Sequence, residues 1–223
     1  MSFLEMLNRR VLPLLTLCLL ALLGTWLVLA PAEARLGNVV KLIYVHGALV
    51  WAGLAAFTLA GALALVALLS RRSVWYRGTQ SAGWVALLVW FIYALSAMIV
   101  TYLTWGQLIA WPEPRVRATA LILAAAVLLA IVRRAVGHPD FAAIVNLVMG
   151  VVPWVVVRQA GVIRHPVDPI GGSQSASIRL YYLLIVWTVA GLVLTLTAWL
   201  WTWLELRIES NSHGDKRAGV DDS

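Results

Sequence analysis

The sequence predicts an all-α, polytopic membrane protein built as a bundle of six transmembrane helices. Hydrophobic residues make up 62% of the 223 residues and charged residues only 12%, whereas soluble domains are about one-quarter charged. The mean hydropathy is +0.88. The charged positions also divide the chain into six long uncharged stretches. Because lipid offers no hydrogen-bond partners to an open backbone, such stretches favour helices over strands.

Each uncharged stretch is expected to contain one span, since a membrane-crossing helix needs about 20 apolar residues. In chain order the stretches are residues 11–32, 42–70, 78–112, 118–132, 141–157 and 180–204. We therefore expect one transmembrane domain over residues 1–208. The polar tail over residues 209–223 is predicted to be disordered.

The first stretch also has features of a signal peptide. Arg9 and Arg10 precede its apolar run, and small residues follow it before Glu33. Its uncharged core of 22 residues is longer than the core of about 7–15 residues that a signal peptide carries. We interpret it as a retained helix, with cleavage as the lesser alternative.

The third and fourth stretches depart from the expected length. The third has 35 residues, so a helix over about residues 82–102 would leave Tyr102 to Pro114 as an apolar, tryptophan-bearing segment at the membrane surface. The fourth has 15 residues. It needs Arg115, Arg117 and Arg133 to extend from its ends to the membrane interfaces.

The distribution of basic residues favours cytoplasmic N- and C-termini. With the N-terminus inside, the inner loops and ends hold ten Lys and Arg residues and the outer loops hold seven, Arg35, Lys41, Arg115, Arg117, Arg158, Arg164 and Arg179. The excess of basic residues on the inner side is small, but it agrees with the positive-inside rule, by which cytoplasmic loops are richer in Lys and Arg. A translocated face with this many cations suggests an anionic ligand there.

Several classes of function are poorly supported. The single cysteine, Cys18, excludes an internal disulfide, a CxxC redox pair and a cysteine-based zinc site. The chain has no glycine-rich phosphate loop, no HExxH and no Ser-His-Asp spacing, so we do not expect an enzyme. In a membrane protein, we expect the basic residues behind the net charge of +7 to set the orientation of the spans and to contact anionic lipid. We do not expect them to bind nucleic acid. A transporter is not excluded, although no acidic residue lies mid-span to relay protons.

Two of the four histidines are candidate metal ligands. His46 lies near the outer end of the second stretch, and His165 lies in the loop before the sixth. Singly, such a histidine is as often a packed, hydrogen-bonded residue as a ligand. As a pair on one face of the membrane, they could give two imidazole nitrogens to one metal ion.

The segment after the third stretch offers a surface for a planar ligand. Trp105 and Trp111 could present ring faces, Gly106 could allow close backbone approach, and Arg115 could pair with carboxylates. The alternative is that these tryptophans belong to an aromatic belt at the level of the lipid headgroups. The total of 12 tryptophans in the chain favours this alternative. A planar ligand with central iron and two edge carboxylates would suit the histidines, indoles and arginines together, and that ligand is heme.

The order of these features resembles the heme exporter protein C (CcmC) family of cytochrome c maturation proteins, within the heme-handling superfamily named for its tryptophan-rich motif. Residues 42–46, ending in His46, look like the family's I-Y-x-H segment. Trp105, Gly106, Trp111 and the run from Glu113 to Arg115 look like a reduced form of its W-G-x-x-W-x-W-D-x-R motif. Asn146 to Pro153 is similar to its fifth span, and His165 to its second histidine. The similarity covers about residues 10–205. The departures are Leu108, Ile109, Pro112, Ala160 and Gly161, where the family usually has other residues, often aromatic.

The resemblance implies a protein of cytochrome c biogenesis in the bacterial inner membrane. It implies non-covalent heme b at the outer face, with His46 and His165 as axial ligands and with Trp105, Gly106, Trp111, Glu113 and Arg115 around it. The implied partners are the membrane and ATPase subunits of an ABC transporter and a periplasmic heme chaperone. Whether heme is held permanently or in transit stays open. The alternatives are a non-heme interaction subunit derived from the family and a b-type membrane cytochrome in electron transfer.

Overall fold

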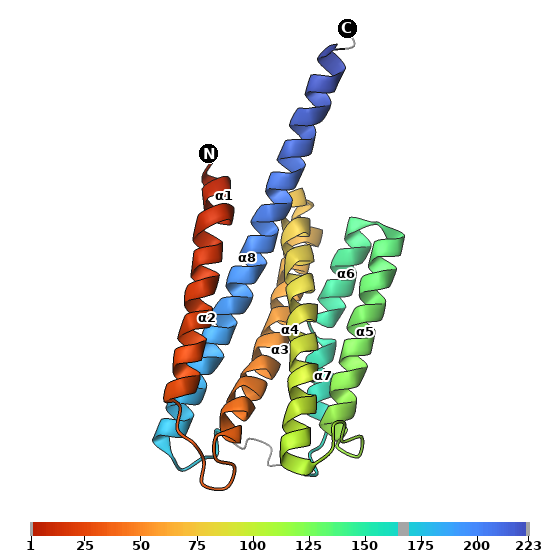
Figure 1. Cartoon of the computed structure of the whole chain (residues 1–223). Helices are drawn as coiled ribbons and strands as arrows, with labels where there is room; N and C mark the ends of the chain where they lie inside the picture. Colours follow the sequence, from red (N-terminus) through yellow and green to blue (C-terminus); the bar gives the residue numbers. More distant parts are fainter. Residues whose placement is uncertain (1, 165–169, 222–223) are drawn as a thin grey trace.

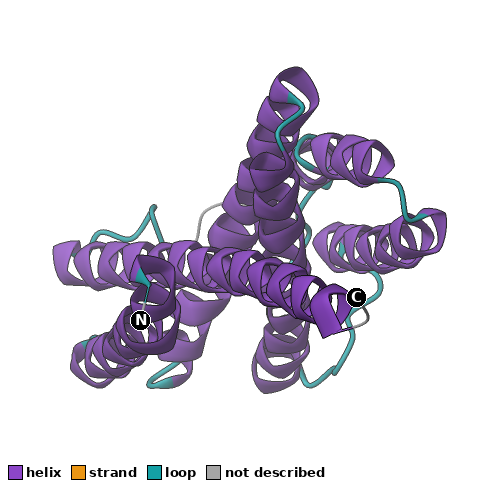
Figure 2. Ribbon diagram, turned by 90° about the horizontal axis from the view of Figure 1, so that it is seen from above, coloured by secondary structure: helices purple, strands orange, loops and turns teal. Residues whose placement is uncertain are grey.

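The computed structural model describes residues 2–164 and 170–221, with side-chain surroundings as far as residue 210. Within those residues the fold is all-α, and the only strand-like contact is an isolated bridge between Glu33 and Gly37. Six helical segments are long and apolar enough to cross a membrane. This confirms the predicted fold class. Figure 2 shows helices joined by loops throughout.

The helices follow one another up and down the bundle, with α2 and α8 lying side by side (Figure 1). The elements are α1 (Phe3–Met6), the π-helical turn η1 (Leu7–Val11), α2 (Leu12–Leu29), α3 (Val39–Ser70), α4 (Ser73–Trp105), α5 (Pro114–Val136), α6 (Pro139–Met149), α7 (Val152–Gln159) and α8 (Ala176–Asp221).

The two ends of the bundle differ, and we name each by a residue. The His46 end carries the connections after α2, α4 and α7. The Arg133 end carries both chain termini and the short turns after α3 and α5 (Figure 1).

Small side chains bring the central helices together. Alanines fill much of the interface of α3, including Ala48, Ala52 and Ala60, all buried. A Cβ atom on Gly61 of α3 would lie 3.0 Å from the Cα of Gly150, at the end of α6. Small residues allow such close backbone approach, which is a common basis of helix association in lipid, where there is little hydrophobic drive between helices.

The fifth span is broken into two helices. The residues at the break are Gly150 and Val151, and Pro153 follows in the first turn of α7. Proline has no N–H to donate and fits only the first turn of a helix. The span therefore continues after the break as a separate helix, α7.

Two predicted boundaries were wrong. The third span is not limited to residues 82–102: α4 runs from Ser73 to Trp105 and ends at Gly106, whose φ is +69°. The tryptophan-bearing segment outside the helix is thus only residues 106–113. α8 is helical as far as Asp221, and the disorder expected for residues 209–223 stays a prediction. The tail contains no proline, and extending an existing helix avoids the cost of nucleating a new one.

Candidate functional site

The described candidate residues gather at the His46 end. His46 lies in the third turn of α3, Trp105 is the last residue of α4, and Glu113 is the N-cap of α5. The loop that follows α7 reaches the same end (Figure 1). His165 lies outside the described residues, so the predicted pairing of the two histidines stays a prediction. The loop is described up to Arg164, the residue immediately before it.

His46 is held by two residues of α4. Its Nδ1 lies 2.9 Å from the Oγ of Ser96. Its ring stacks on Tyr93 with 4.9 Å between the ring centroids and an interplanar angle of 25°. Tyr93 and Ser96 are three residues apart and so lie on one face of the helix. Together they fix both the position and the plane of the imidazole.

The hydrogen bonds of Ser96 determine which ring nitrogen of His46 carries the proton. The Oγ of Ser96 donates its hydrogen to the carbonyl of Tyr93, at 2.7 Å. It can then only accept from His46, so Nδ1 is the protonated nitrogen. The lone pair that could bind a metal is therefore on Nε2. This is how metal-binding histidines are usually oriented, with the other nitrogen donating to a protein oxygen.

Glu113 is a buried carboxylate that joins two loops. Only 1% of the residue is exposed. It does not cap its own helix, and its carboxylate instead accepts the backbone N–H of Ile163 at 3.3 Å and that of Arg164 at 3.0 Å. The nearby N-terminus of α5 also favours a negative charge. These contacts account for a charge at a buried position, and they tie the loop before His165 to the start of α5.

Arg164 attaches the same loop to the tryptophan-bearing segment. Its guanidinium lies over the ring of Trp105, 5.7 Å from the centroid. One of its nitrogens donates to the Oε1 of Gln107 at 3.2 Å. The backbone turns sharply between these two residues at Gly106, in the left-handed region that favours glycine. Part of the Trp105 surface that the sequence assigned to a ligand thus faces Arg164.

A second set of contacts leads from His46 towards Glu113. Tyr93, which stacks on His46, is linked through its hydroxyl to Thr119 of α5, at 3.4 Å. The hydroxyl of Thr119 donates to the carbonyl of Arg115, at 2.8 Å. Arg115 is two residues from Glu113 on the first turn of α5. The described contacts therefore connect His46, through α4 and α5, to the loop residue next to His165.

The remaining predicted residue, Trp111, is 56% exposed. It offers ring surface at the His46 end. Five further residues belong to the site and were not predicted from the sequence: Tyr93, Ser96, Gln107, Thr119 and Arg164. The sequence places Tyr93 and Ser96 on one face of a helix, but it does not show that this face contacts a histidine 50 residues earlier.

The loop between α2 and α3 has a carboxylate of its own at this end. Glu33 accepts the backbone N–H groups of Leu36 and Arg35, at 2.9 and 2.8 Å. These hydrogen bonds, with that of Leu36 the largest contribution, hold the pKa of Glu33 below its usual value. Glu33 is thus a half-buried counterpart of the fully buried Glu113.

Within the described residues, no group of three or more His, Cys, Asp or Glu side chains could hold a metal ion. A bis-histidine site needs only two protein ligands. Comparison with known proteins identified no matching protein-family model and no matching curated protein.

Proposed function

We propose that the protein is an integral membrane heme-handling protein of cytochrome c biogenesis. It binds heme b non-covalently at the outer membrane face, which is the His46 end, and passes it to a periplasmic heme chaperone. The ABC-transporter subunits and the chaperone are proposed as partners because the chain resembles the CcmC family. The bacterial inner membrane, with both termini in the cytoplasm, is the location that the same resemblance and the arginine distribution support.

One observation carries the proposal: the tautomer and position of His46. The imidazole is half-buried near the end of a span, and because Nδ1 donates to Ser96, the lone pair of the ring lies on Nε2. Stacking on Tyr93 limits rotation of the ring. A ligand oriented by such contacts loses little entropy on binding metal. His46 would thus be suited to hold the iron of heme through Nε2, and the bound heme would supply the iron that the protein carries.

The loop that Glu113 holds is proposed to carry the second, exchangeable ligand. Two backbone hydrogen bonds to Glu113 and two side-chain contacts of Arg164 fix the residues just before His165. Delivery of heme requires one ligand to leave while the other keeps its place. His46 lies on a long helix and His165 follows a loop held by a few polar contacts, so we assign retention to the first and release to the second.

A non-heme interaction subunit is the second candidate. Exposed apolar side chains in the loop between α4 and α5 favour it. Leu108, Ile109 and Trp111 of this loop are 54%, 41% and 56% exposed. Such a surface could contact another protein. A b-type cytochrome would also bind heme. It would oxidise and reduce the heme iron reversibly and would not transfer the heme to another protein.

The test is heme content and its optical spectrum. The protein, expressed with heme available and purified in detergent, should give a low-spin b-type spectrum with one heme per chain by pyridine hemochrome. His46→Ala should lose it. His138→Ala, at the opposite end of the bundle, is the matched control and should keep it. No heme in the wild type, even with added hemin, would overturn the proposal and favour the interaction subunit. Transfer of the heme to an apo-chaperone would separate handling from electron transfer.

A further inference from the structure

The Arg133 end contains a pocket that the proposed function does not use. It has a volume of about 610 Å³ and lies among the first turns of α4 and α6 and the last turns of α5. Small-molecule sites typically have volumes of about 300–1,000 Å³. The lining runs from Ser73 to Trp84 along α4, which is about 16 Å at the rise of an α-helix.

The pocket has a strong positive charge. Its lining contains four arginines, Arg71, Arg77, Arg133 and Arg134, together with His138. No carboxylate belongs to the lining in the part of the chain that the structure describes.

Two of these arginines are neutralised from outside the lining. Arg71 pairs with Asp140 at 2.6 Å, and Arg77 pairs with Glu205 at 2.6 Å. The Nε of Arg77 is nevertheless buried with no hydrogen-bond partner among the described residues. Arg133 and Arg134 have no acidic partner within the described residues. Among the described residues, the pocket therefore keeps two guanidinium groups that no carboxylate neutralises.

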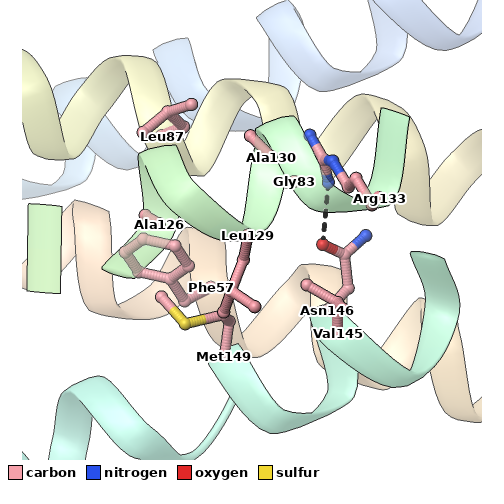
Figure 3. Close-up of a pocket in the computed structure, with 10 residues that line it drawn as sticks. All are labelled: Phe57, Gly83, Leu87, Ala126, Leu129, Ala130, Arg133, Val145, Asn146 and Met149. Carbon is pink, nitrogen blue, oxygen red and sulfur yellow. Dashed lines mark hydrogen bonds between the residues drawn. The ribbon is translucent and has the colours of Figure 1, made fainter. Parts of the chain in front are cut away.

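Arg133 is fixed in a way that directs its charge into the pocket. Its guanidinium lies 4.5 Å from the ring centroid of Trp84. One nitrogen donates to the Oδ1 of Asn146 at 3.0 Å, and the amide of Asn146 in turn donates to Thr79. Figure 3 shows Arg133 and Asn146 directed at each other beside a small cavity of about 20 Å³, which is otherwise mostly apolar. Since these partners are neutral, the charge of Arg133 is positioned but not cancelled.

The surrounding backbone and side chains add further donors. The N-terminal turns of α4 and α6 both border the pocket, and helix N-termini favour anions. Tyr76, Thr79 and Gln80 contribute polar groups to the lining. The Tyr76 hydroxyl already donates to Asp140 and the Thr79 hydroxyl to the carbonyl of Ala60, so the donors that favour an anion are the guanidinium groups of Arg133 and Arg134. The complementary ligand is an anion with several acceptor oxygens.

We propose that this pocket is a binding site for a phosphate-bearing anion. Guanidinium groups match phosphate oxygens with two parallel hydrogen bonds, and basic pockets between transmembrane helices commonly hold phospholipid headgroups. Trp84 is 38% exposed at the deep end of the lining, while Arg134 and His138 are exposed at the shallow end. The pocket is thus accessible to a lipid headgroup from the bilayer side and to a soluble phosphate compound from the aqueous side.

The experiment measures binding of two probes to delipidated, detergent-purified protein. Phosphatidylglycerol is titrated and followed by native mass spectrometry, with phosphatidylcholine for comparison, and inorganic pyrophosphate is titrated by calorimetry. The test variant is Arg134→Gln, which removes an exposed side chain and leaves the packing intact. The matched control is Arg207→Gln, an equal charge change on α8, where Arg207 lies over Trp203 and outside the pocket.

At least one probe is expected to bind saturably with one site per chain. Arg134→Gln should weaken that binding about five-fold, as expected for one arginine near a headgroup, and Arg207→Gln should change it less than about two-fold. Preference for phosphatidylglycerol identifies a lipid site, and binding of pyrophosphate identifies a soluble phosphate ligand. The proposal is overturned if neither probe saturates, or if both variants weaken binding equally.

Discussion

Replacing Glu113 with glutamine is the sharpest test of how the candidate site is held together. The carboxylate accepts two backbone N–H groups from the loop before His165. Glutamine has nearly the same shape but only one acceptor oxygen, and its amide group would face an N–H. We therefore expect the loop over residues 160–164 to open more often in Glu113→Gln, with the helices unchanged.

The magnitude follows from the number and kind of bonds lost. A hydrogen bond to a charged group contributes about 1.5–3 kcal/mol and a neutral one about 1. Losing one of the two bonds to Glu113 and weakening the other costs about 3 kcal/mol. Removing the charge from a site with 1% exposure relieves part of the desolvation cost. A net effect of about 2 kcal/mol corresponds to a roughly 30-fold increase in the open fraction.

Hydrogen–deuterium exchange measures this opening directly. In detergent, the amides of Ile163 and Arg164 should exchange about 30-fold faster in Glu113→Gln than in the wild type, as the net free energy requires. Glu33→Gln is the matched control, because Glu33 also accepts two backbone N–H groups, from Arg35 and Leu36. It should affect only its own loop. Unchanged exchange at residues 163 and 164 in Glu113→Gln would refute the assigned role of the carboxylate.

Three further predictions concern other parts of the structure. Ser96→Ala should keep the fold but lower heme affinity about 10- to 100-fold, as measured by hemin titration, because His46 loses the contact that orients it. The protection factors of the Arg35 and Leu36 amides, which correct for the slower intrinsic exchange at low pH, should fall on acidification. The pKa of Glu33 is lowered in the folded state, so its stabilising effect is present above the usual glutamate pKa and is lost as the pH falls through the lowered value. Gly61→Ala should lower thermal stability in detergent by about 1–3 kcal/mol, since its Cβ would meet the backbone of α6 at 3.0 Å. Gly24→Ala, with nothing within 4 Å, should not.

The number and order of the spans could be predicted from sequence because lipid imposes a simple rule on composition and length. The ends of the spans could not. Arg77 was taken as the boundary of the third span, yet α4 begins at Ser73 and includes it. The charge of Arg77 is tolerated there because Glu205, on another helix, pairs with it at 2.6 Å. A partner 128 positions away leaves no trace in the local sequence.

The site was predictable only in its individual residues. His46 was singled out because an imidazole inside an apolar stretch is unusual. Its tautomer depends on Ser96 and Tyr93, and these are ordinary residues within the third span. Glu113 was noted as a substitute for an aspartate in a motif, whereas its observed contacts are with the backbone of a different loop. Backbone N–H groups have no sequence signature, so such a contact requires the folded chain.

Charged side chains at both ends of the bundle obey one physical requirement. A charge close to the membrane must be paired or solvated by the protein. Glu113 uses the N–H groups of a loop and the start of α5, Arg77 uses Glu205 of α8, and Arg133 uses Trp84 and Asn146. The hydrogen-bond, ion-pair or ring partner of each charge belongs to a different element from the charge itself. These charges therefore join elements as well as mark their ends. Arg133 differs from the other two because its partners are neutral, which leaves its charge available to bind an anion.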